Sequence, residues 1–121
     1  DSGGQYAMID IHGNRNSITG YQMNAGSGGH TADIYIWGDD NSAWIRQKNN
    51  NSKNLDLLIK NDDNVVSVLQ KDHAAHSAAI TLDGSYGTNL NLTQQSSTAQ
   101  SYTLIQNCLT VGGCNISVIQ Q

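Results

Sequence analysis

Asn41-Ser-Ala-Trp-Ile-Arg-Gln47 and Asn64-Val-Val-Ser-Val-Leu-Gln70 are two seven-residue segments that share one pattern. Each begins and ends with an amide side chain and carries apolar residues at alternate positions between them. Alternation with a period of two predicts a β-strand, in which successive side chains point to opposite faces. The amides and the apolar residues have the same phase, so they are expected to point to the same face.

The glutamine that closes each segment belongs to a repeat that runs through the whole chain. It recurs at intervals of 25, 23, 24 and 26 residues as Gln22, Gln47, Gln70, Gln94 and Gln120. Six residues before each of these positions stand Asn16, Asn41, Asn64, Thr88 and Cys114. A period in the twenties is typical of architectures in which neighbouring repeats stack to bury a common core.

A second alternating run precedes each segment and completes the repeat. In four repeats it ends in Ile11, Ile36, Ile59 and Leu82, and in the fifth it reads less regularly as Leu104, Gln106 and Cys108. Short turns rich in Gly, Asn and Asp, with Gly13, Gly38 and Gly84, lie between the two runs. We therefore expect one domain, 1–121, with repeats at about 5–22, 30–47, 53–70, 76–94 and 102–120.

These repeats predict an all-β fold, a β-solenoid of five strand-turn-strand units stacked about 4.7 Å apart. Its interior would hold an aliphatic ladder of Ile11, Ile36, Ile59 and Leu82. It would also hold an amide ladder of Asn16, Gln22, Asn41, Gln47, Asn64, Gln70, Gln94 and Gln120. Buried amides are tolerated when each donates to the residue above and accepts from the one below.

Composition narrows the possible functions of the 121-residue chain. Its net charge is −4 and its six Lys and Arg residues are scattered, so we do not expect nucleic-acid binding. The sequence has no run of about 18 apolar residues, so it does not predict a membrane-spanning helix. His73 and His76 lack a third ligand at useful spacing, and no nucleophile elbow or phosphate loop is present. We expect no catalytic residue, metal or cofactor.

The pattern resembles the curlin repeat of bacterial curli fibres, most closely in the Asn41–Gln47 and Asn64–Gln70 segments. The glycine in the turn between the two strands of that repeat matches Gly13, Gly38 and Gly84, and Asn61 stands at this position in the third unit. The chain departs from the family at the first Gln of the family's repeat, which is replaced here by Ile11, Ile36, Ile59 and Leu82. The opening Ser of the family's repeat is also replaced, by Gln5, His30, Lys53, His76 and Tyr102.

The resemblance implies a secreted amyloid subunit of the extracellular biofilm matrix. It also implies export through an outer-membrane pore and growth seeded by a nucleator subunit. A nucleator of this family typically ends in a basic repeat, whereas no Lys or Arg follows Lys71 here. The resemblance thus favours a major fibre subunit, not a nucleator.

Uncapped solenoid ends predict self-assembly. They expose unpaired backbone groups that soluble proteins usually block with Pro, charge or a covering helix, and the chain has no Pro. Similar first and last units would join head to tail into an open cross-β filament, with the chain itself as the main partner.

Two other functions remain as alternatives at this stage. A monomeric β-solenoid could bind carbohydrate through outward aromatics, notably Trp37 and Trp44 with Tyr6, Tyr21 and Tyr35. A hydrolase could use the acidic pairs Asp39-Asp40 and Asp62-Asp63, although these recur as turn residues.

The two cysteines, Cys108 and Cys114, flank the last turn. They could form a disulfide that closes this turn, as an extracellular setting would allow, or remain two buried thiols.

Overall fold

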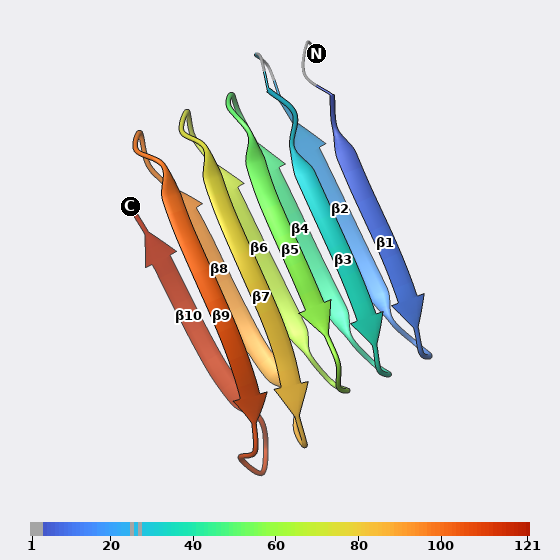
Figure 1. Cartoon of the computed structure of the whole chain (residues 1–121). Helices are drawn as coiled ribbons and strands as arrows, with labels where there is room; N and C mark the ends of the chain where they lie inside the picture. Colours follow the sequence, from blue (N-terminus) through green and yellow to red (C-terminus); the bar gives the residue numbers. More distant parts are fainter. Residues whose placement is uncertain (1–3, 25, 27) are drawn as a thin grey trace.

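The computed structural model describes residues 4–24, 26 and 28–121, and this part of the chain contains ten β-strands (Figure 1). They are β1 (Tyr6–His12), β2 (Ser17–Met23), β3 (Thr31–Trp37), β4 (Ser42–Lys48), β5 (Lys53–Ile59), β6 (Val65–Lys71), β7 (His76–Gly84), β8 (Thr88–Gln95), β9 (Gln100–Cys108) and β10 (Cys114–Gln120). Two consecutive strands and the turn between them, here called an arc, form one rung. Rung 1 contains β1 and β2, and rung 5 contains β9 and β10.

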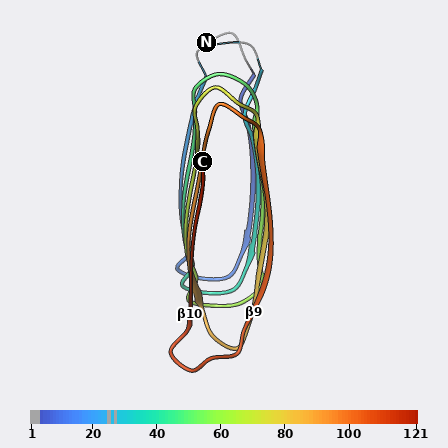
Figure 2. The same cartoon turned by 90° about the vertical axis from the view of Figure 1, so that its left-hand side faces the viewer.

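The strands form two parallel five-stranded sheets that face each other. Odd-numbered strands follow the order β1-β3-β5-β7-β9, and even-numbered strands the order β10-β8-β6-β4-β2. Viewed along the stack, the rungs superpose as flattened loops, with one sheet on each side (Figure 2). The predicted all-β solenoid of about five turns is thereby confirmed. No helix in the described residues is long and apolar enough to cross a membrane.

The interior is a narrow apolar core between the two sheets. On each strand of the middle rungs, alternate residues are buried, as the period of two requires. The core consists of aliphatic side chains from rungs 2 to 4, and Ile18, Tyr102, Leu104, Ile116 and Val118 pack against it from the end rungs. Because the rungs stack in register, like residues contact each other. Each rung therefore covers the inward apolar side chains of its neighbours.

The fifth rung corrects one sequence prediction. Pairing places Gln100, not Tyr102, beside His76, and Tyr102 lies beside Ala78. The expected start at 102 and the run Leu104, Gln106, Cys108 were therefore two residues out of register. The reason is the last arc, in which residues 109–113 separate the strands while only residues 85–87 do so in rung 4. The two extra residues lie in this arc, so the preceding turn keeps its usual length.

Candidate functional site

The two ends of the stack are open and form the candidate functional site. β1 and β2 at one end, and β9 and β10 at the other, each pair with a single neighbouring strand. Among the described residues, no further strand lies beside their outer edges, so these edges carry backbone N–H and C=O groups without a strand partner. Such edges are templates for pairing with another chain.

Interior side chains are uncovered at the first end. Ile9 is 48% and Ile11 is 40% exposed, although both have the inward phase of the core. Ile34 and Ile36, which pair with them in rung 2, are 2% and 0% exposed. The difference arises because a rung covers its neighbour on one side, and nothing in the described chain covers rung 1 on its outer side.

A continuous ladder of glutamines runs through the interior. The Nε2 of each donates to the Oε1 of the next: Gln22 to Gln47 at 2.8 Å, Gln47 to Gln70 at 2.9 Å, Gln70 to Gln94 at 2.8 Å and Gln94 to Gln120 at 2.8 Å. The same nitrogens also donate to backbone carbonyls of the facing strand, those of Tyr6, Thr31, Asn54 and Ser77. These bonds satisfy amides that would be costly to bury alone.

This ladder has a direction, so its two ends differ. At rung 1 the Oε1 of Gln22 accepts no hydrogen bond from the described residues, while at rung 5 the Nε2 of Gln120 donates only to Ser101 O, at 3.1 Å. An amide nitrogen has two donor hydrogens. One end of the stack therefore presents an acceptor and the other presents a donor at the same register position.

The asparagines form a ladder of a different kind. The Oδ1 of Asn16 accepts the backbone N–H of Asn41, that of Asn41 accepts the N–H of Asn64, and that of Asn64 accepts the N–H of Thr88. Only Asn64 also donates from its side chain to the asparagine before it, at 2.9 Å. This column therefore ties each side chain to the next rung's backbone at the entrance of the second strand.

The aliphatic positions Ile11, Ile36, Ile59 and Leu82 pair in register from rung to rung. Gln106 follows them in rung 5, where it pairs with Leu82. The apolar column therefore ends with an amide at the second end of the stack.

The arcs approach one another closely, which accounts for three of the glycines. A Cβ on Gly13 would lie 2.0 Å from Gly38 O, and one on Gly38 would lie 2.4 Å from Asn61 O. Gly84 repeats the arrangement against the backbone of Cys108. A side chain at these positions would push neighbouring rungs apart.

Acidic residues of the arcs link each arc to the one before it. The Oδ1 of Asp39 accepts the N–H of Asn14, and that of Asp62 accepts the N–H of Asp39, each at 2.7 Å. Asp40 binds the Arg15 guanidinium through two bonds of 2.6 Å. This bonding lowers the pKa of Asp40 and raises that of Arg15.

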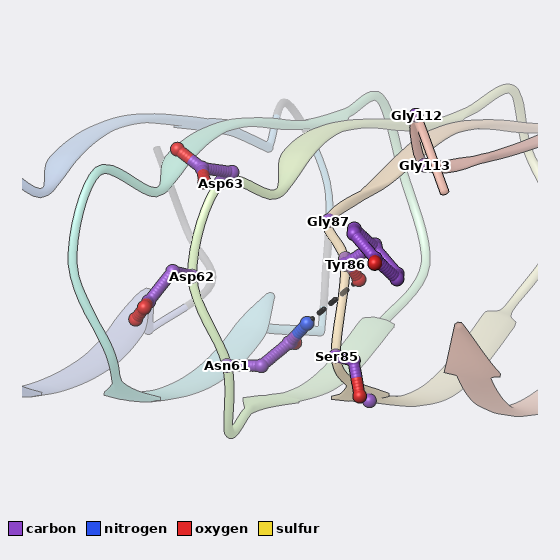
Figure 3. A pocket seen from close by; sticks show the side chains of 9 residues that line it. Asn61, Asp62, Asp63, Ser85, Tyr86, Gly87, Gly112 and Gly113 are labelled. Carbon is purple, nitrogen blue, oxygen red and sulfur yellow. Dashed lines mark hydrogen bonds between the residues drawn. The ribbon is translucent and has the colours of Figure 1, made fainter. Parts of the chain in front are cut away.

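A hollow of about 360 Å³ lies where the third, fourth and fifth arcs meet. Asn61 donates across it to Tyr86 O at 2.8 Å, and the side chains of Asp62 and Asp63 point away from Ser85 (Figure 3). The acidic residues and the serine are thus not arranged to share a reacting atom. Among the described residues, no group of three or more His, Cys, Asp or Glu could hold a metal ion.

A buried polar column closes the opposite edge of the core, and sequence reasoning did not single it out. Lys53, 0% exposed, donates from Nζ to Asn50 O, Asn51 O and Ala74 O at 2.7, 3.1 and 2.8 Å. His30 and His76 are buried on either side of it. Burial lowers the pKa of all three groups. The inward phase of these positions is the sequence signal that could have indicated the column.

The outer surface carries aromatics beside cations. The guanidinium of Arg46 lies 4.0 Å from the ring centroid of Trp44, and Lys48 Nζ lies 5.5 Å from that of Tyr21. Trp44 is 49% and Tyr21 46% exposed. Tyr6 and Trp37 are also exposed, on β1 and β3 of the other sheet, and Tyr35 is partly covered.

Cys108 and Cys114 are joined by a disulfide that closes the last arc. Of the two arrangements open to sequence reasoning, the structure contains the bridged one.

No protein family, curated protein or solved structure matches this chain.

Proposed function

We propose that this chain is a structural subunit that assembles end to end into a cross-β filament. The observation that carries the proposal is the pair of open ends, at which interior columns stop with their next partner missing. Rung 5 of one copy would lie against rung 1 of the next, extending both sheets through the junction. Backbone pairing at about 4.7 Å spacing is the basis of cross-β stability.

Apolar burial favours this junction. Ile9 and Ile11 are about half exposed at rung 1, whereas their equivalents within the stack are covered. Covering the exposed half of an isoleucine contributes about 1 kcal/mol. Leu104, Ile116 and Val118, which are partly covered at rung 5, would be covered by the same contact.

The glutamine ladder supplies polarity. The free donor of Gln120 would meet the free acceptor of Gln22 in the next copy, continuing the direction of the four bonds inside the chain. A contact between unlike ends does not close on itself, so it produces an open filament. Joining two like ends would instead oppose donor to donor or acceptor to acceptor.

Resemblance to curlin repeats adds a setting to this proposal. A curli-like role places the subunit in an extracellular fibre of the biofilm matrix, with a nucleator subunit and an outer-membrane secretion pore as partners. The disulfide fits an oxidising compartment.

The test is to dilute the full chain from denaturant and follow thioflavin fluorescence, electron microscopy and fibre diffraction. We expect filaments with a reflection near 4.7 Å along their axis. A folded protein that stays monomeric for days at high concentration, measured by light scattering, would overturn the proposal.

Carbohydrate binding is a second candidate, favoured by the stacked Trp44 and Arg46 on the outer sheet face. Aromatic rings beside cations suit the apolar faces and hydroxyls of sugars. Titrating monomer with cellohexaose would change tryptophan fluorescence if this candidate holds, and Trp44→Ala would abolish the change. No change up to millimolar sugar would reject it.

A further inference from the structure

Rung 1 contains an apolar hollow that opens at the first end of the stack. Its volume is about 220 Å³, and its lining includes Ala7, Ile9, Gly20 and Gln22 with Ala32, Ile34 and Ile45 of the next rung. These residues belong to the interior columns. The core is therefore incompletely filled at this end.

Two columns explain where the missing volume lies. One reads Ala7, Ala32, Leu55, Ala78, Tyr102 from rung 1 to rung 5, and the other reads Gly20, Ile45, Val68, Leu92, Val118. In the second column rung 1 has the smallest residue, glycine. In the first column rung 1 has alanine, as rungs 2 and 4 do, and rung 5 has the largest side chain. The volume lacking at one end is thus present as a tyrosine at the other.

No contact among the described residues requires the glycine at position 20. A Cβ added there would meet no atom within 4 Å, unlike those at Gly13 and Gly38. Glycine in the interior of a strand weakens the strand. The other rungs all carry branched aliphatic residues at this position. Its small size leaves space that no described residue fills.

We propose that Tyr102 of one copy enters the hollow over Ala7 and beside Gly20 of the next copy, and that this fit fixes which ends join and in which register. The inference rests on the proposed end-to-end assembly. Continuing the register places Tyr102 between Ala78 of its own chain and Ala7 of the next, two small residues that leave room for a ring. Sliding the junction by one residue would pair Tyr102 with Tyr6 or Met8 of the next copy, which have the outward phase, so the ring would no longer lie over Ala7.

A size-swap experiment tests this fit in the full chain. Gly20→Val fills the hollow with the residue that rungs 3 and 5 carry, and Tyr102→Ala removes the ring. Each single variant is expected to slow seeded elongation at least tenfold. The double variant Gly20→Val with Tyr102→Ala is expected to elongate faster than either single variant, because one change compensates the other.

Controls separate the fit from general damage. Thr19→Val changes the outward neighbour of Gly20 and should elongate at the wild-type rate, as should Tyr102→Phe, which keeps the ring. Unfolding of the monomers by denaturant checks that each variant is folded. Absence of wild-type filaments would overturn the proposed function itself. Wild-type filaments with unaffected single variants, or with losses that simply add in the double variant, would overturn the fit alone.

A cross-linking measurement covers the case in which a single variant does not fold. Filaments grown from chains with photoreactive p-benzoylphenylalanine at position 102, mixed with isotope-labelled wild-type chains, are irradiated and digested. Cross-links from position 102 to the labelled segment containing Ala7 or Gly20 support the fit, and cross-links to other labelled segments only contradict it.

Discussion

The backbone N–H of Lys53 donates to Nδ1 of His30 at 3.3 Å, inside a buried column in which both side chains are fully covered. Since Nδ1 accepts this bond, His30 is neutral and its Nε2 donates to Met23 O at 3.1 Å. His76 lies on the other side of Lys53 in register. The lysine charge, held by three carbonyls, therefore lies beside the neutral imidazole of His30, with His76 on its other side.

This column predicts that acid destabilises the fold. Burial lowers the pKa of His30 and His76 in the folded state, so below about pH 6.5 the unfolded chain binds more protons. Stability is complete above pH 6.5 and is lost as pH falls through the lowered pKa values. Each histidine contributes a slope of at most about 1.4 kcal/mol per pH unit. Urea unfolding of the monomer at pH 7.5 and pH 5 measures it.

Matched variants identify the responsible histidines. His30→Gln and His76→Gln should flatten the pH dependence, because Gln5 and Gln100 occupy the same column at its two ends. His73→Gln, on an exposed turn position, should leave it unchanged. A slope that survives in the double buried variant would contradict the assignment.

The glutamine ladder predicts a large cost for an interior deletion. Gln70→Ala leaves the Gln47 donor, the Gln94 acceptor and Asn54 O without their partner. Unpaired buried groups cost about 1 to 3 kcal/mol each, so the loss in unfolding free energy is expected to be at least about 3 kcal/mol. Gln47→Ala should act similarly, and both should slow filament growth.

Gln95→Ala provides the control for this prediction. Gln95 follows Gln94 on β8 and has the outward phase, and surface changes usually stay within about 0.5 kcal/mol. Equal losses for Gln70→Ala and Gln95→Ala would show that the ladder bonds do not stabilise the monomer.

Close packing of the arcs predicts that Gly38→Ala destabilises the chain. The added Cβ would lie 2.4 Å from Asn61 O, so the rungs must separate, at a cost of about 1 to 3 kcal/mol. Gly20→Ala, which meets no atom within 4 Å, is the control and should be as stable as wild type or more so. Denaturant midpoints of the two monomers give the comparison, and a stable Gly38→Ala variant would reject the close approach.

The Cys108–Cys114 bridge predicts a modest effect of reduction. It closes a short loop, with a sequence separation of 6 residues, and the chain-entropy relation gives about 2 kcal/mol for such a loop. Unfolding with and without a phosphine reductant measures the change. Native protein should show no free thiol before reduction, and two titratable thiols in native protein would contradict the bridge.

Much of the fold could be predicted because both of its periodicities are visible in the residues. Alternation over Asn41–Gln47 and Asn64–Gln70 indicates strands, and the recurrence of glutamine aligns the rungs. Rung 5 was predicted two residues out of register, since an insertion in the arc and one in the preceding turn give the same spacing between Gln94 and Gln120. The pairing of β7 with β9, for example Gly84 with Cys108, distinguishes them.

The order of the residues was sufficient to predict a solenoid and its inward columns, because inward phase and rung spacing follow directly from periodicity. Contacts between rungs, by contrast, depend on how facing strands are positioned across the core. The burial of Lys53 against three carbonyls, the donor direction of the glutamine ladder and the hollow beside Gly20 are such contacts. They emerge only when two sheets close on each other, since a hydrogen bond's direction and an unfilled volume are properties of paired surfaces, not of one strand.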